Sequence, residues 1–240
     1  MPHIETPEGI RIRYEERGAG RPLVLAHGFG VSLEMWMPQL LALSQEHRLI
    51  TWDARGHGGS SAPAEPEAYS MSALAGDLRA LLETIGAAQG AIIGGMSFGG
   101  QIALQYASEY LDDTYALLLS DSTTRGPEPP RDPREAAAAW GVAGDPGLEG
   151  GLRAMAERPD LTRALPGLSM PALVMYGEHD EMIARGVQRV VDGLPRRRMT
   201  VLAECFHGTS SQRPSAWNAA VLRFLADVEA AHPLGDEEFV

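Results

Sequence analysis

The sequence predicts an α/β fold in which helices cover both faces of a mostly parallel, doubly wound sheet. Short apolar runs recur along the 240 residues, and continuous apolar runs are typical of strands buried on both faces. After about residue 20, segments with helical periodicity separate these runs, and such an alternation favours a doubly wound sheet. Since a chain of this length fits one large α/β domain, we expect a single domain over residues 1–240.

Seven strands are expected along the chain. The segment 10–16 alternates apolar and polar residues, which is the pattern of a half-buried strand. The six later strands are short apolar runs. We expect the first two strands to form an antiparallel edge of the sheet. The expected strands are Ile10–Glu16, Arg21–Gly28, His47–Asp53, Ala91–Gly95, Tyr115–Asp121, Pro171–Gly177 and Arg198–Glu204.

Helical patterns lie between most of these strands. In the segment 72–86 leucines recur with helical spacing, and Gly86 supplies a stop signal. The segment 122–170 breaks the alternation, because it begins rich in Pro and Arg and then becomes helical. Connections longer than about 12–15 residues are usually functional or disordered, so we expect residues 122–170 to form a short helical lid over the carboxyl edge of the sheet. Further helices are expected at 100–111, 181–194 and 215–231.

Composition excludes several classes of protein. The formal net charge is −12, which opposes binding to a phosphate backbone, so no nucleic-acid partner is expected. All 20 cationic residues are Arg, which excludes a Schiff-base lysine and a P-loop lysine. No apolar run approaches the roughly 18–20 residues that span a bilayer, and the N-terminus lacks a signal-peptide pattern. We therefore expect a cytoplasmic protein with no membrane partner.

One serine lies between two glycine pairs, in the stretch IIGGMSFGGQIAL from Ile92 to Leu104. Glycine weakens both strands and helices, so four glycines at this point need a reason. Gly95, Ser97 and Gly99 form a G-x-S-x-G pattern between an apolar strand and a helix, which is the context of a nucleophile elbow. In such an elbow the serine backbone is strained, and the residues two before and two after it pack against each other. The pattern predicts Ser97 as a nucleophile.

A serine hydroxyl needs an adjacent base to act as a nucleophile. Of the seven histidines, His207 follows the last expected strand, and an open α/β sheet places its site in the loops at the carboxyl ends of strands. His27 and His57 lie in glycine-flanked turns, where a local structural role is expected. We predict His207 as the general base.

A carboxylate must orient that imidazole and stabilise its charged form. Asp180 follows the expected strand 171–177, and its neighbours Glu178 and Glu181 compete for this role. The main rival is Asp121, at the end of the expected strand 115–121. A carboxylate at position 180 could instead cap the next helix. We favour Asp180, because the order Ser97, Asp180, His207 then matches the Ser–Asp/Glu–His order of one family of serine hydrolases.

The chain resembles the α/β-hydrolase-fold serine hydrolases. The stretches HGFG, DARGHGGS, GMSFGG, GEHD and FHG occur in the family's order and at similar spacings. The resemblance implies an oxyanion hole formed by the backbone N–H groups of Phe29 and Phe98. It also implies that Asp53, Arg55 and His57 form a structural turn. Relatives that open epoxides or cleave carbon–halogen bonds carry Asp at the nucleophile position, so a serine argues against both activities.

No metal or cofactor is expected. The histidines lack H-x-x-x-H spacing and the elbow lacks the G-x-G-x-x-G phosphate cradle. The lone cysteine, Cys205, is expected to be a small buried residue. We expect the side chains of Phe29, Phe98 and Trp140 to form the wall of the substrate pocket.

The favoured function is hydrolysis of small neutral carboxylic esters through an acyl-enzyme, because a short lid can cover only a small substrate. An alternative is an enol-lactonase, since the run LRAMAERPDLTRALPGLSMPALVMYGEHD is similar to the run before the acid in 3-oxoadipate enol-lactonases. That resemblance implies an anionic substrate and a cationic residue near the lid, for which the candidates are Arg125, Arg131, Arg134 and Arg153.

Two further alternatives stay open. A cofactor-free perhydrolase would differ only in that peroxide attacks the acyl-enzyme instead of water. A ligand-binding relative without turnover would use the same pocket. The expected partner in every case is a small molecule, an ester or lactone, and the sequence does not indicate the oligomeric state.

Overall fold

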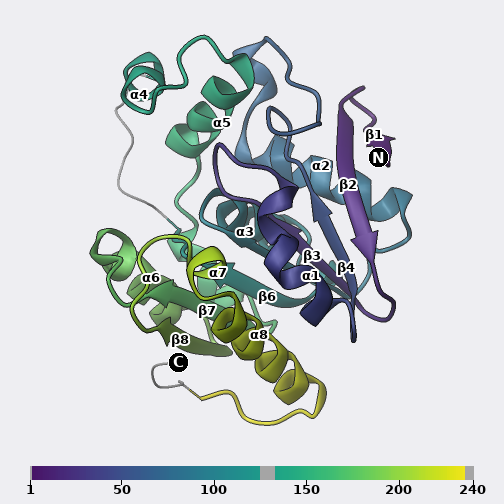
Figure 1. Ribbon diagram of the computed structural model, residues 1–240, viewed down its shortest axis with the longest axis vertical. Coiled ribbons are helices and arrows are strands. Elements are labelled where there is room, and N and C mark those ends of the chain that lie inside the picture. Colours follow the sequence, from purple (N-terminus) through teal and green to yellow (C-terminus); the bar gives the residue numbers. More distant parts are fainter. Residues whose placement is uncertain (1, 125–132, 236–240) are drawn as a thin grey trace.

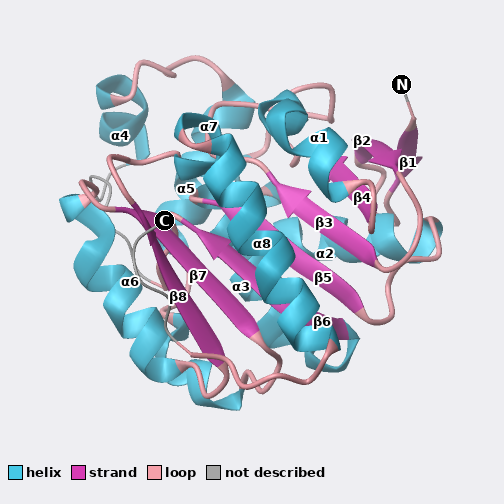
Figure 2. Cartoon of the chain, turned by 60° about the horizontal axis from the view of Figure 1, so that its bottom comes forward, coloured by secondary structure: helices cyan, strands magenta, loops and turns pink. Residues whose placement is uncertain are grey.

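The computed structural model describes residues 2–124 and 133–235, and within them one sheet has eight strands in the order β1-β2-β4-β3-β5-β6-β7-β8 (Figures 1 and 2). The strands are β1 (His3–Glu5), β2 (Arg11–Arg17), β3 (Pro22–Ala26), β4 (Arg48–Trp52), β5 (Ala91–Met96), β6 (Thr114–Ser120), β7 (Ala172–Gly177) and β8 (Arg197–Leu202). From β4 to β8 in this order every pair is parallel. The predicted mostly parallel, doubly wound sheet is confirmed.

The predicted pairing at the sheet edge is wrong. β2 pairs antiparallel with β1 and β4, whereas β3 lies between β4 and β5 and runs parallel to both. Residues 23–26 of β3 are at most 1% exposed, so this strand needs cover on both faces and suits the centre of the sheet. The alternating β2 suits a place near the edge. The three-residue β1 was not predicted from the sequence.

Helices cover both faces of the sheet, as Figure 2 shows. One face packs against α1 and α8 in a core that includes Trp36, Trp217 and Phe224. The other face packs against α2, α3 and α6. These helices are α1 (Met37–Leu43), α2 (Met71–Thr84), α3 (Phe98–Glu109), α6 (Glu181–Gly193) and α8 (Pro214–Glu229). The short helix α7 (Thr209–Gln212) precedes α8. The sequence did not predict α1, which is only seven residues long and follows a 3₁₀ turn at Leu33–Trp36.

The lid segment, residues 122–170, contains α4 (Pro133–Ala139) and α5 (Pro146–Glu157). Figure 1 shows the two helices side by side beyond one end of the sheet. A glycine contact fixes α5 to the turn after β4: a Cβ on Gly147 would lie 2.4 Å from the carbonyl oxygen of Gly56. A Cβ on Gly150 would lie 2.4 Å from the ring of Tyr69. Glycine therefore permits a backbone approach that no larger residue would allow.

Among the described residues, no helix is both long enough and apolar enough to cross a membrane.

Candidate active site

Ser97 occupies a sharp turn between β5 and α3. Its φ of 53° and ψ of −111° lie outside the regions that ordinary residues adopt, and such strain costs on the order of 1–3 kcal/mol. A Cβ on Gly95 would lie 2.3 Å from the carbonyl carbon of Gly99, and a Cβ on Gly99 would lie 2.1 Å from the oxygen of Ala26. The predicted strain and close approach are both confirmed. This turn raises the Ser97 side chain above the ends of the strands.

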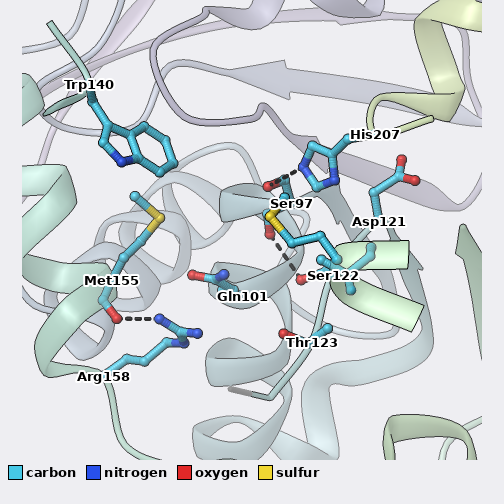
Figure 3. A pocket seen from close by; sticks show the side chains of 11 residues that line it. Ser97, Gln101, Asp121, Ser122, Thr123, Trp140, Met155, Arg158 and His207 are labelled. Carbon is cyan, nitrogen blue, oxygen red and sulfur yellow. Dashed lines mark hydrogen bonds between the residues drawn. The ribbon is translucent and has the colours of Figure 1, made fainter. Parts of the chain in front are cut away.

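The structure joins Ser97, His207 and Asp180 in one hydrogen-bonded chain. Nδ1 of His207 lies 2.7 Å from Oδ2 of Asp180, and Nε2 lies 2.9 Å from Oγ of Ser97. A carboxylate only accepts, so Nδ1–H donates to Asp180 and Nε2 is left to accept the Ser97 proton. Figure 3 shows the contact between Ser97 and His207. The geometry therefore suits proton transfer from the serine hydroxyl to the imidazole.

Asp180 follows β7 and stands at the N-terminus of α6. Its side chain makes no capping hydrogen bond to that helix, so the capping alternative is wrong. The loop of Asp180 lies tightly against the loop of His207, because a Cβ on Gly177 would be 2.5 Å from the carbonyl oxygen of Cys205. The backbone N–H of His179 donates to that same oxygen at 2.8 Å. These contacts position the acid beside the imidazole.

Gln212 fixes the loop that carries His207. Its Nε2 donates to the carbonyl oxygen of His207 at 2.6 Å, and its Oε1 accepts the backbone N–H of Phe206 at 3.0 Å. Gly208, at φ +96°, turns the chain into α7 between these residues. Gln212 was not predicted from the sequence, because no motif distinguishes a glutamine five residues after a candidate histidine.

Asp121 was the rival candidate for the carboxylate that orients His207, but it does not form a hydrogen bond to that histidine. Its Oδ2 accepts the backbone N–H of Thr209 at 3.0 Å, the Thr209 hydroxyl at 2.7 Å and the Ser120 hydroxyl at 3.1 Å. It nevertheless lies near the site. One oxygen of Asp121, one oxygen of Asp180 and one ring nitrogen of His207 lie within 4.8 Å of one another.

Those three residues are also the one group among the described residues that could offer a metal ion three ligands. Both ring nitrogens of His207 are already hydrogen-bonded within the site, one of them to Asp180, and Oδ2 of Asp121 accepts from Thr209. The arrangement therefore suits a proton relay rather than a preformed metal site. Elsewhere near the site, Cys205 is buried and its burial raises the pKa of the thiol, as suits a small core residue.

The backbone N–H groups of Phe29 and Phe98 lie in neighbouring segments. Phe98 is the first residue of α3, and the first N–H groups of a helix have no acceptor within it. The rings of Phe29 and Phe98 meet edge to face with centroids 6.1 Å apart. Gly99 also packs against the carbonyl oxygens of Ala26 and His27, which holds the HGFG segment beside the elbow. The oxyanion hole itself stays a prediction.

A cavity of about 120 Å³ opens beside Ser97 (Figure 3). Its wall is partly apolar, with Trp140 and Met155 from the lid segment and Met182 and Ile183 from α6. The structure thus places Trp140 at this cavity, and its contact with a substrate stays a prediction. The remaining lining residues are Ser97, Gln101, Asp121, Ser122, Thr123, Arg158 and His207.

The prediction that the Phe98 side chain forms the pocket wall is wrong. Its ring is 0% exposed and packs against His57 at 5.3 Å between centroids. The start of α3 points this side chain into the core while the adjacent Ser97 points outward. Phe29 does not line this cavity either; its ring meets Trp140 edge to face at 5.4 Å, so it supports the wall from behind.

Among the described residues that line this cavity, Arg158 is the arginine, and it was not predicted from the sequence. It comes directly after α5 and donates from Nη1 to the carbonyl oxygen of Met155. Among the predicted candidates, Arg153 pairs with Glu157 at 2.9 Å and Glu67 at 3.5 Å and does not line the cavity. Arg125, Arg131 and the side chain of Arg134 lie outside the described residues.

The turn after β4 forms a buried scaffold, as expected. Asp53 accepts the backbone N–H of Leu33 at 2.7 Å, and Arg55 forms two hydrogen bonds of 2.6 Å with Asp77. Burial lowers the pKa of His57 to about 4, so this histidine is neutral at pH 7. The turn therefore supports the fold beneath the site and is not part of the proton relay.

Comparison with known proteins identifies the fold family. The family model for the alpha/beta hydrolase fold matches residues 21–163. Epoxide hydrolase 4 of Mus musculus is 37% identical over 46% of this chain, a match that spans 31% of that protein. The chain thus spans less than half the length of the first curated relatives it matches.

Two solved structures match over nearly the whole chain. A thermophilic esterase from Thermogutta terrifontis has a TM-score of 0.86 and 26% identity, covering 95% of this chain and 99% of the esterase. An enol-lactonase from Burkholderia xenovorans LB400 has a TM-score of 0.82 and 25% identity, covering 94% and 100%. Since the family model covers more than half of the chain, and the sheet and elbow have the arrangement it implies, the chain belongs to the α/β-hydrolase fold family.

Proposed function

We propose that the protein is a serine hydrolase that cleaves small carboxylic esters through an acyl-enzyme. The observation that carries this proposal is the hydrogen-bonded chain from Asp180 through His207 to Ser97, which ends at a cavity of about 120 Å³. Ser97, His207 and Asp180 are assigned the roles of nucleophile, general base and orienting carboxylate. No cofactor or metal takes part in the proposed reaction.

The reaction proceeds in two halves. Oγ of Ser97 bonds to the ester carbonyl carbon while its proton passes to Nε2 of His207, and the C=O electron pair moves onto oxygen. The backbone N–H groups of Phe29 and Phe98 hold that oxyanion. The tetrahedral intermediate expels the alcohol, which takes the proton from Nε2. Water then attacks the acyl-enzyme, His207 accepts and returns one proton, and the carboxylic acid leaves Ser97.

The cavity limits the size of the acyl group. Its volume of about 120 Å³ is well below the roughly 300–1,000 Å³ of sites for drug-sized ligands. Trp140, Met182 and Ile183 make part of its wall apolar, which favours a short neutral hydrocarbon chain. We therefore assign substrates with acyl groups of a few carbon atoms.

The test compares wild type and Ser97→Ala on p-nitrophenyl acetate, butyrate and octanoate. We expect turnover of the two shorter esters, a pre-steady-state burst from the acyl-enzyme, and a loss of kcat of at least about a thousandfold in the variant. Ser72→Ala is the matched control, since Ser72 bonds Glu109 at the opposite end of α3 from Ser97. Equal rates above buffer for wild type and Ser97→Ala would overturn the proposal.

Arg158 favours a second candidate function, hydrolysis of an ester or lactone that carries a carboxylate. Its guanidinium lines the same cavity as the amide of Gln101 (Figure 3), and planar guanidinium groups bind carboxylates through paired hydrogen bonds. One structural neighbour is an enol-lactonase. The carboxylate would lie at Arg158 while the carbonyl lies at Ser97.

Substitution of this arginine separates the two candidates. If carboxylated substrates are used, Arg158→Gln raises KM for p-nitrophenyl hemisuccinate at least about tenfold and leaves KM for the neutral butyrate within twofold. Arg153→Gln is the control, because that arginine faces Glu157 and Glu67. Equal effects of Arg158→Gln on both substrates would exclude the carboxylate role.

The remaining alternatives stay predictions. Perhydrolysis would give peracid when hydrogen peroxide is added to the ester assay, and a ligand-binding relative would show saturable binding without turnover. Action in the cytoplasm, on a small molecule and without a nucleic-acid or membrane partner, is part of the proposal.

A further inference from the structure

Two carboxylates, not one, approach the imidazole of His207. Asp180 follows β7, and Asp121 follows the neighbouring strand β6. One oxygen of each and one ring nitrogen of His207 lie within 4.8 Å of one another. Figure 3 shows Asp121 on the opposite side of the His207 ring from Ser97. The second carboxylate is therefore near Nδ1, which is the nitrogen that must keep its proton.

Asp121 is held in place at a cost. It has a φ of 50°, in the left-handed region that Asp adopts more readily than most residues other than glycine. It is 1% exposed, and burial raises the pKa of its carboxyl group. Burial of a carboxyl group carries a desolvation cost that an apolar residue in this corner would not have, so the placement of a carboxylate here calls for an explanation.

The two oxygens of Asp121 have different surroundings. Oδ2 accepts three hydrogen bonds, two from Thr209 and one from Ser120. Oδ1 is buried, and no hydrogen-bond donor among the described residues reaches it. Buried acceptors without a donor are uncommon and carry a desolvation cost. The titratable groups closest to Asp121 are His207 and Asp180, with the Cys205 thiol also within electrostatic reach.

We infer that Asp121 is a positioning residue for His207, a second carboxylate that can accept a hydrogen bond from Nδ1–H when Asp180 cannot. Oδ2 holds the loop that carries His207 through Thr209, and Oδ1 offers a further acceptor that has no donor of its own among the described residues. This inference rests on the proposed serine hydrolase mechanism. In that mechanism the acceptor keeps Nδ1 protonated, so that Nε2 stays free to take the Ser97 proton.

The test measures kcat and KM for p-nitrophenyl butyrate in Asp180→Asn, Asp121→Asn and the double variant. Loss of the orienting aspartate in a serine protease lowers kcat by about 10⁴-fold. Here we expect Asp180→Asn to lose no more than about a hundredfold, and the double variant to lose at least a further tenfold in kcat with KM unchanged. A double variant as active as Asp180→Asn would overturn the inference.

Thr209→Val separates positioning through charge from support of the loop. It removes the hydroxyl that donates to Oδ2 but keeps the carboxylate and the Thr209 backbone bond. We expect Asp180→Asn/Thr209→Val to keep the rate of Asp180→Asn within threefold. A fall as deep as that of the Asp121→Asn/Asp180→Asn double variant would show that Asp121 acts only by holding the loop, and would overturn the inference.

One measurement needs no substitution at Asp121, in case that variant does not fold. In Asp180→Asn, a downfield proton NMR signal from Nδ1–H of His207 would show that a carboxylate still binds it, and absence of that signal would overturn the inference. Ser97→Ala serves as the check on the underlying mechanism. If it is as active as wild type, the serine mechanism fails, whereas an inactive Ser97→Ala with indistinguishable Asp180→Asn and double variants refutes the role of Asp121 alone.

Discussion

The carboxyl edge of the sheet and the lid segment face each other across one cavity, but they are built in different ways. At the sheet edge the contacts are between backbones: Gly99 meets Ala26, and Gly177 meets Cys205, at distances that no Cβ would tolerate. The lid segment contributes long side chains instead, among them Trp140 and Arg158. Backbone contacts fix the reacting groups. The shape of the cavity depends instead on side chains that can be exchanged without moving the backbone.

The lid segment is not loosely placed, however. Gly147 of α5 meets Gly56, and Gly150 meets Tyr69, as closely as the glycines of the elbow meet their neighbours. The helix is thus fixed to the turn that also carries His57. The two regions differ in what points into the cavity and not in how firmly α5 is held.

The largest expected effect is at the sheet edge. His207→Gln removes the acceptor of the Ser97 proton, and loss of the base of such a relay costs about 10⁴-fold or more in kcat. Steady-state kinetics on p-nitrophenyl acetate measure this loss, and thermal unfolding verifies that the variant is folded. Trp140→Phe, on the lid side, is the comparison and should keep kcat within about threefold. A similar loss in both variants would contradict the division between the regions.

The second prediction sets one glycine of each region against the other. A Cβ at Gly99 would be 2.1 Å from Ala26, and a Cβ at Gly147 would be 2.4 Å from Gly56. Overpacking of this kind costs about 1–3 kcal/mol of folding stability, so both alanine variants should unfold at lower denaturant concentration. Only Gly99→Ala should also lose kcat, by at least a hundredfold, because it displaces the Ser97 turn.

Gly147→Ala should instead raise KM severalfold with kcat nearly kept, because it moves α5 and the wall that follows it. Chemical denaturation and steady-state kinetics on the same preparations give both quantities. If Gly147→Ala lowered kcat as far as Gly99→Ala, the lid segment would be part of the reacting geometry.

The same difference explains what the sequence could predict. Ser97, Asp180 and His207 were predictable because backbone constraints impose glycines and a fixed chain order around them. Arg158 was not, because a side chain that reaches the cavity from the end of a helix leaves no pattern in spacing. The exchange of β3 for β1 at the sheet edge was missed for a related reason: local apolarity predicts a strand but not its neighbour.

The third prediction concerns pH and the turn that joins the two regions. Burial lowers the pKa of His57 to about 4, whereas in the unfolded chain it stays near 6.5. The free energy of unfolding is therefore highest above pH 6.5. It decreases as the pH falls toward 4, since the unfolded state takes up the proton first. The expected loss is on the order of 1–3 kcal/mol.

Unfolding by urea at several pH values between 4 and 7 measures this slope. Burial likewise lowers the pKa of His27 to about 4, so His57→Gln should reduce the slope and not abolish it. An unchanged slope in His57→Gln would show that other groups govern the acid sensitivity. A Cβ at Gly151 of α5 would be 3.1 Å from the His57 ring, so protonation there should also loosen the contact between α5 and the turn.

The smallest expected effect is on the lid side, where substrate preference is set. Trp140 is 54% exposed and closes one side of the cavity, so Trp140→Ala should lengthen the space for the acyl chain. One methylene in an apolar pocket is worth about 1–3 kcal/mol of discrimination, and a partly exposed wall should give the lower end of that range. We therefore expect the ratio of kcat/KM for the octanoate ester to that for the acetate ester to rise about tenfold, with kcat on acetate nearly unchanged.

The neighbouring Phe29→Leu provides the comparison, since the ring of Phe29 contacts Trp140 at 5.4 Å between centroids. This variant should shift the ratio in the same direction by a smaller factor. A fall in kcat on acetate in Trp140→Ala, without a change in the ratio, would mean that the lid segment positions the reacting atoms and does not select the acyl group.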